Sequence, residues 1–248
     1  MMRTILNVLW QLGLWLIVIP GILGIILVAI SRANKRLVAM QNGLWGMILL
    51  GGIGVILHEL SHLILALLFG HHIDRVALLH IPDRNDPSDN CLGYVNHSFN
   101  DHNLYQRCGN FFIGIAPVLG CTLAMTLLTR TLAPQVYNYC LQLFLPTMAP
   151  LPVSAGSKWQ LIVWLILMVN IAVGGFDLSS ADLQNSAHGV TALLLILLGL
   201  AAILAWLSNP LMVGQWLSAH LIIAYWALIL AIVFNLILWL FLHLIVRR

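Results

Sequence analysis

The chain has 248 residues, of which 61% are hydrophobic and only 8% are charged. Soluble domains carry roughly 25% charged residues, so this composition excludes an ordinary soluble domain and indicates an integral membrane protein. The formal net charge of +3 is small and spread along the chain, which argues against a nucleic-acid partner. No polar stretch is long enough to fold separately, so we expect a single membrane domain over residues 1–248.

The apolar segments predict an all-α polytopic membrane protein. A helix needs about 20 apolar residues to span a bilayer, and tryptophans near several segment ends suit the interface. The first segment is too long for the apolar region of a signal peptide, so we expect it to be a retained span. Lys and Arg are divided too evenly between the two sides to give the orientation. Six segments are long enough, at about 4–30, 43–70, 109–129, 159–176, 187–207 and 219–246.

Two connections between these segments are long. The first, 71–108, is the most polar part of the chain, and in it "RVALLHI" and "LGYVNHSF" flank the turn-rich "PDRNDPSDN". This pattern predicts a β-hairpin between the second and third spans. The second connection, 131–157, is rich in proline but still fairly apolar. We expect it to lie along the membrane surface or to dip into the membrane.

The second apolar segment contains three ionisable residues, in the order His58-Glu59-Leu60-Ser61-His62, and Glu59 is the only glutamate of the chain. Residues four apart lie on one face of an α-helix, about 40° apart around its axis. His58 and His62 can therefore bind one Zn²⁺ ion, with Glu59 beside it as the general base that activates a water. A charged residue at the centre of a spanning helix costs on the order of 2.5–3.5 kcal/mol, and such residues mark function by default. A polar cluster that only bonds neighbouring helices is the weaker alternative, because Gln or Ser would serve at a smaller penalty.

A catalytic zinc site needs a third protein ligand and leaves its fourth position for water. Five of the seven aspartates belong to the polar loop, where a solvated turn explains them. Asp177 and Asp182, in "VGGFDLSSADLQNSAHG", lie between two spans and are the candidates. Each also has a structural explanation, since Ser179 or Ser180 looks like an N-cap and Asp182 would then lie in the first helical turn. The other histidines, His97 among them, are interpreted as loop, packing or interfacial residues.

These residues resemble the site-2 protease family of intramembrane zinc metalloproteases. The resemblance rests on HELSH in the second of six spans, on "GNFFIGIAPVLG" in the third and on an aspartate near the end of the fourth. It covers about residues 58–182. The family's usual Asn-Pro stretch ending in Leu-Asp-Gly is missing, and "LSSADLQNSAHG" is more similar to a divergent bacterial subgroup. On that likeness Asp182 is preferred to Asp177 as the third ligand, and Asn170 matches the family's asparagine only loosely.

The resemblance implies a zinc-dependent protease in the bacterial cell membrane, with His58, His62 and Asp182 as metal ligands and Glu59 as the catalytic base. Its partners would be the lipid bilayer and a membrane-embedded peptide or single-span protein, cut within or beside its membrane segment. An edge strand at 92–99 could hold that peptide in extended form. The alternative is a non-catalytic zinc-binding membrane protein or a metal-ion transporter. The scarcity of acidic residues in the spans argues against an ion relay.

Overall fold

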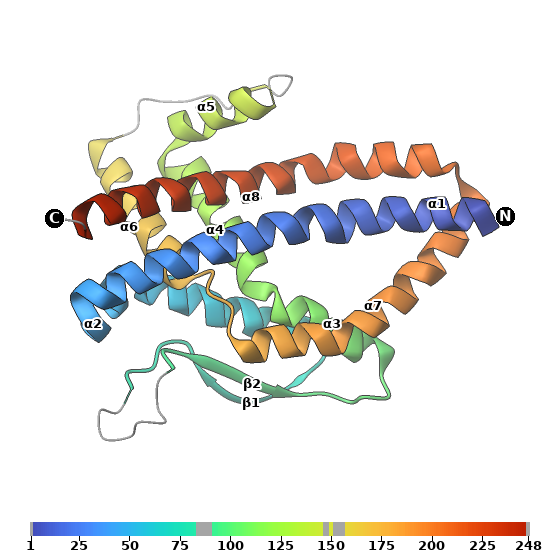
Figure 1. The fold of residues 1–248 in the computed structure, drawn as a ribbon, viewed down its shortest axis with the longest axis horizontal. Coiled ribbons are helices and arrows are strands. Elements are labelled where there is room, and N and C mark those ends of the chain that lie inside the picture. Colours follow the sequence, from blue (N-terminus) through green and yellow to red (C-terminus); the bar gives the residue numbers. More distant parts are fainter. Residues whose placement is uncertain (1, 83–90, 146–148, 151–156, 247–248) are drawn as a thin grey trace.

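A computed structural model of the chain describes residues 2–82, 91–145, 149–150 and 157–246. Most of these residues are helical, and a single small β-hairpin lies on one side of the helices (Figure 1). The elements are, in chain order, α1 (Met2–Gly13), the π-helical turn η1 (Leu14–Val18), α2 (Ile19–Leu68), β1 (His72–Ala77), β2 (Tyr94–Ser98), α3 (Leu104–Gly114), α4 (Ala116–Leu132), α5 (Pro134–Phe144), α6 (Lys158–Gly174), α7 (Ser180–Leu207) and α8 (Pro210–Val246).

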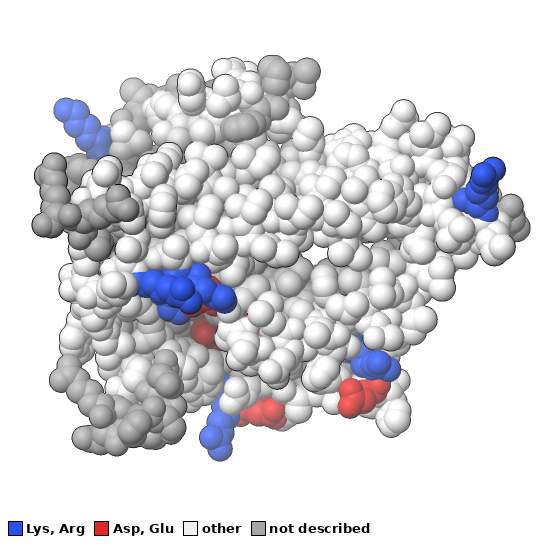
Figure 2. Space-filling model, viewed as in Figure 1, with Lys and Arg blue, Asp and Glu red and all other residues white. Residues whose placement is uncertain are grey.

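Several of these helices are long and apolar enough to cross a membrane. In the described residues three runs qualify, Met2–Leu68, Ser180–Leu207 and Pro210–Ile245, and the bent pair α3 and α4 makes a fourth. The helix α6 is apolar but has only 17 residues. The face of the molecule in Figure 2 is mostly free of charged side chains, and those present gather in a few small groups. The long apolar helices and the small hairpin agree with the fold class expected from the sequence, a helical membrane protein with a small hairpin.

The long helix α2 folds back on itself at Gly43. This glycine has a φ of 56° and a ψ of −153°, a backbone conformation that other residues rarely adopt. Ser31 Oγ donates a hydrogen bond to Ala172 O (2.7 Å), while Gly51 lies against the backbone of Gly174. In a straight helix Ser31 and Gly51 would be about 30 Å apart. The first two predicted spans therefore form a helical hairpin. Residues 31–42, which the sequence analysis placed in neither span, continue the first helix up to the turn.

The segment predicted as a third span, 109–129, is broken rather than straight. The helices α3 and α4 meet at Ile115 with a bend of 57°. Pro117 has no N–H to donate to the carbonyl four residues earlier, and its ring crowds that carbonyl, so a continuous helix is disfavoured here. The break leaves the Ile113 carbonyl, near the end of α3, available to a side chain from another helix.

The predicted β-hairpin is confirmed, with a shift in its first strand. The strands β1 and β2 are antiparallel and pair His72 with Ser98 and Ala77 with Tyr94, with an irregularity between Ile73 and Arg75. The first strand thus begins three residues before the predicted "RVALLHI". Residues 83–90, most of the predicted turn, lie outside the described residues.

The connection predicted to follow the membrane surface, 131–157, contains a helix that the sequence analysis did not predict. This helix, α5, has Leu141 and the following Leu145 buried against Trp226 and Ala227 of α8. Helix–helix packing therefore accounts for part of the apolar character of this connection. Residues 146–148 and 151–156 lie outside the described residues.

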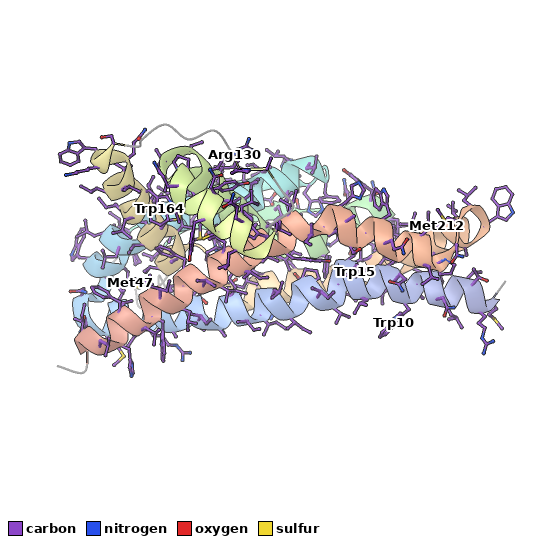
Figure 3. The ribbon with its side chains drawn as sticks, turned by 90° about the horizontal axis from the view of Figure 1, so that it is seen from above. Trp10, Trp15, Met47, Arg130, Trp164 and Met212 are labelled. Carbon is purple, nitrogen blue, oxygen red and sulfur yellow. The ribbon has the colours of Figure 1, made fainter. Side chains whose placement is uncertain are left out.

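The main core lies where α2, α4, α6 and α8 meet. Buried Leu27, Met125, Met168 and Phe176 belong to one apolar cluster there. Trp164 of α6 closes its edge, and its Nε1 donates to Thr129 Oγ1 (3.0 Å). Trp164 lies among the helices in Figure 3, whereas Trp10, which is 64% exposed, projects away from them. The core thus fixes the end of α6 against α2, and the segment that follows α6 leads to the polar residues described next.

Candidate metal centre

The second arm of α2 carries His58, Glu59 and His62 into the interior of the protein. All three side chains are buried, each with at most 8% of its surface exposed. The helical spacing places the two imidazole rings next to each other, with ring centroids 4.9 Å apart. The geometry expected from an i, i+4 histidine pair is therefore present.

Each histidine ring is held through its Nδ1 atom by a backbone carbonyl. His58 Nδ1 donates to Gly175 O (3.0 Å), and His62 Nδ1 donates to Ile113 O (2.8 Å). A carbonyl oxygen can only accept, so each Nδ1 carries a hydrogen, and each neutral ring then has its lone pair on Nε2. The chain thus aims two unprotonated Nε2 atoms inward, which is the arrangement that metal-binding histidines show.

Three acceptor groups converge at this point. The two Nε2 atoms are 3.2 Å apart, and Asp182 places Oδ1 3.2 Å from His62 Nε2 and Oδ2 3.8 Å from His58 Nε2. One ligand atom of each residue lies within 4.8 Å of the other two. Ligands of a tetrahedral ion bound at about 2.0–2.1 Å are roughly 3.3 Å apart. Two imidazole lone pairs and a carboxylate repel one another unless a cation or a proton lies between them, so this donor set could hold a metal ion.

Asp182 also caps its own helix. Ser179 is the N-cap of α7, and its side chain accepts from the Asp182 N–H (3.1 Å), while Asp182 Oδ2 accepts from the Ser179 N–H (2.6 Å). The two interpretations that the sequence offered for Asp182, helix capping and metal binding, are therefore compatible. The capping box fixes the carboxylate on the side of the histidines.

Two glycines let two pairs of helices approach closely, α2 with α6 and α3 with α7. A Cβ atom on Gly54 of α2 would lie 2.3 Å from Asn170 O and 2.8 Å from Gly175 N, and one on Gly114 of α3 would lie 2.2 Å from Asp182 O. Any larger side chain would push α2 from the end of α6, or α3 from the start of α7. These contacts bring the carbonyls of Gly175 and Ile113 to the histidines.

A cleft of about 430 Å³ opens beside the three acceptor groups, and its wall includes His58, Glu59, His62, Asp182 and the segment Gly93–His97 of the hairpin. The hairpin lies directly over the glutamate. A Cβ atom on Gly93 would be 2.7 Å from Glu59 Cγ and 3.0 Å from Glu59 Oε1. Glu59 therefore faces the cleft next to the candidate ligands but outside their group, as a general base requires.

The other candidates from the sequence lie elsewhere. Both carboxylate oxygens of Asp177 are in ion pairs, with Arg32 and Lys35. Asn170 accepts from the Ile53 N–H (3.3 Å) and thereby joins α6 to α2. His97, interpreted from the sequence as a loop residue, lies in the wall of the cleft. His97 reaches the cleft because β2 pairs with β1, which directly follows α2. No local sequence motif indicated this position of His97.

In comparisons with known proteins, no family model, curated protein or solved structure matched the chain. The likeness to site-2 proteases therefore rests on the sequence motifs quoted above.

Proposed function

We propose that the protein is an intramembrane zinc metalloprotease of the site-2 protease type, a multi-pass protein of the bacterial cell membrane. The observation that supports this most is the convergence of His58, His62 and Asp182 next to Glu59, in a cleft lined by α2, α7 and the hairpin. Buried ionisable residues in an apolar helix are costly and are retained for function. The metal ligands in this proposal are the two histidines and Asp182.

The proposal includes six membrane passes. The hairpin at Gly43 supplies two, the bent pair α3 and α4 supplies one, and α6, α7 and α8 supply one each. Glu59 lies near the middle of the second pass, 43–70, which would place the reaction within the membrane. The irregular backbone at Ile115 and after Gly174 lines the centre of the protein rather than its rim, as is tolerated inside a membrane.

Peptide hydrolysis needs a nucleophile, a base and a proton for the leaving amine. Zinc, when bound, supplies Lewis-acid polarisation and makes a water nucleophilic at neutral pH. His58, His62 and Asp182 hold the metal, and the carbonyls of Gly175 and Ile113 fix the two rings. Glu59 accepts the proton of the attacking water and returns it to the amine as the peptide bond breaks.

The cleft suits a peptide in extended form. Five consecutive residues of the hairpin, Gly93–His97, line it, and the pairing with β1 uses only one edge of β2. An edge strand can hold a peptide through main-chain hydrogen bonds. A transmembrane helix has its carbonyls in internal hydrogen bonds and must unwind before one can be attacked. We therefore propose a membrane-embedded peptide or single-span protein as the substrate.

Two measurements test the proposal. The purified protein should hold about one zinc per chain, and His58→Ala and His62→Ala should lose it, while His220→Ala, which removes an exposed histidine of α8, should not. Undiminished zinc in the first two variants would contradict the proposed ligands.

The second measurement concerns Glu59→Gln, which keeps the size of the side chain but cannot take a proton. It should slow cleavage of a single-span peptide in liposomes by about 10²–10⁴-fold while keeping most of the zinc. Cleavage at the wild-type rate would show that Glu59 is not the base. Zinc flux into proteoliposomes without any cleavage would instead favour a transporter.

A further inference from the structure

A second pair of histidines meets beside the cleft, although 26 residues separate them in the sequence. His71 directly follows the turn after α2, and His97 lies in β2; their Nδ1 atoms are 3.0 Å apart. His71 is buried, and its Nε2 lies 2.9 Å from the backbone oxygen of Gln106 in α3. These contacts link the wall of the cleft to α3 through two imidazole rings.

The Gln106 carbonyl determines which nitrogen of His71 carries a hydrogen. A carbonyl oxygen only accepts, so His71 Nε2 must donate to it. Burial lowers the pKa of His71 and outweighs the opposing effect of the Gln106 hydrogen bond, which favours the neutral ring. A neutral imidazole has one N–H only, so His71 Nδ1 is an acceptor.

The same reasoning fixes His97. His71 Nδ1 accepts, so His97 Nδ1 must be the donor in the 3.0 Å contact. Burial, together with the nearby His71 and His62, lowers the pKa of His97 to about 4 despite the opposing charge of Asp74. The ring of His97 is therefore neutral near pH 7, and its remaining nitrogen, Nε2, has a lone pair and no hydrogen.

His97 lines the cleft, and its unprotonated Nε2 is a hydrogen-bond acceptor. Among the described residues, the group that fits a shared metal is His58, His62 and Asp182, without His97. An unprotonated nitrogen cannot donate to a developing oxyanion. It can accept an N–H, and an extended peptide presents N–H groups that cost about 1–3 kcal/mol each if buried without a partner.

We propose that His97 Nε2 binds the substrate by accepting a hydrogen bond from a backbone N–H of the extended peptide, and that His71 is the positioning residue that holds His97 in this tautomer. The inference rests on the proposed protease function, because it names a substrate contact in the same cleft.

The tautomer can be tested without any activity. Ring ¹⁵N and ¹³C NMR of the full-length protein in micelles, with His97 assigned by comparison with His97→Ala, should show His97 protonated on Nδ1 alone. His71→Ala removes the acceptor, so the same ring should shift toward protonation on Nε2. Protonation of wild-type His97 on Nε2 would overturn the proposal, whatever the protein does to peptides.

Substrate binding can be tested on a synthetic single-span peptide of leucine and alanine with a central Gly-Ser pair, in liposomes. In a Glu59→Gln background, which prevents turnover, His97→Ala should weaken binding by about 5–10-fold, the value of one hydrogen bond. An analogue in which an ester replaces the contacted amide should bind the protein that retains His97 with an affinity lower by a similar factor. The same analogue should lose no further affinity when His97 is changed to Ala. The control His72→Ala removes an exposed histidine of β1 and should bind like its parent.

The outcomes separate this inference from the proposed function. If His97→Ala binds and cleaves the peptide normally, the inference alone is overturned. The same holds if the loss of affinity caused by His97→Ala and the loss caused by each ester analogue simply add. Loss of zinc in His97→Ala would also overturn it, because His97 would then act on the metal. A zinc-loaded wild type that neither binds nor cleaves the peptide would contradict both.

Discussion

Asp177 and Asp182 lie five residues apart in the segment between α6 and the first turn of α7, yet their carboxylates have opposite surroundings. Asp177 accepts from Arg32 Nε and Lys35 Nζ, each at 2.8 Å, and Arg32 also donates to the Leu178 carbonyl. Burial by itself would raise the pKa of Asp177, but the hydrogen bonds and charges of Lys35 and Arg32 outweigh it and lower that pKa. Arg32 and Lys35 thus compensate the negative charge of this carboxylate.

Asp182 forms no ion pair with a Lys or Arg among the described residues and faces two imidazole nitrogens instead. Its charge is thus left for a cation shared with His58 and His62. Charge compensation, rather than position along the connection, distinguishes a carboxylate that anchors the chain from one that can bind a metal. Asp177 anchors the connection to α2, and Asp182 completes the candidate metal centre.

The largest expected difference between the two aspartates is in zinc binding. Changing a residue that merely orients a ligand costs roughly 10–100-fold in metal affinity, so Asp182→Ala, which removes a ligand, should cost more than about 100-fold. Asp177→Asn should keep about one zinc per chain. Zinc content after dialysis against a graded chelator measures both. Loss of zinc in Asp177→Asn alone would reverse the assignment.

A smaller effect, on the free energy of unfolding, is expected when Asp177 loses one of its two cationic partners. Arg32→Met removes hydrogen bonds to Asp177 and to Leu178 O, whereas Lys35→Met removes one to Asp177. Because these side chains are partly exposed, we expect Arg32→Met to cost about 1–2 kcal/mol and Lys35→Met less.

Thermal unfolding in detergent, followed by circular dichroism, would measure this order. The matched control is Arg36→Met, one turn after Arg32 on α2, which forms no ion pair among the described residues. Equal midpoints for Arg32→Met and Arg36→Met would show that the ion pairs do not anchor the connection.

The smallest effect is a pH dependence of stability at the Asp177 end. Its pKa is lower in the folded protein than the ordinary value of 3.8, so the ion pairs stabilise the fold fully above that value. The contribution disappears as the pH falls through the lower folded pKa. Wild type should therefore unfold at a higher temperature than Asp177→Asn at roughly pH 5–7, and the difference should shrink below about pH 3.5. A difference that stays constant down to pH 3 would contradict this.

The sequence by itself determined the features that depend on neighbouring residues. Helical spacing placed His58 and His62 on one face, and of the two serines that the sequence offered as N-cap, Ser179 takes that position, with Asp182 in the first turn of the helix. The apolar segments predicted long helices, and two β-prone runs around a turn predicted the hairpin. Periodicity and capping act over a few residues, so the sequence displays them directly.

Only the tertiary structure decided which distant groups meet. The chain reversal at Gly43 brings Arg32 and Lys35 to Asp177, and the break at Ile115 turns the end of α3 toward His62. The pairing of His71 with His97 likewise requires the hairpin to fold back over α2. These contacts join residues 26 to 145 positions apart, and such contacts depend on how helices pack and where glycines let them approach. Local sequence preferences do not encode that packing. The sequence therefore indicated His58, His62 and Glu59 by their spacing and Asp182 only through a resemblance, and it did not indicate that His97 lines the cleft.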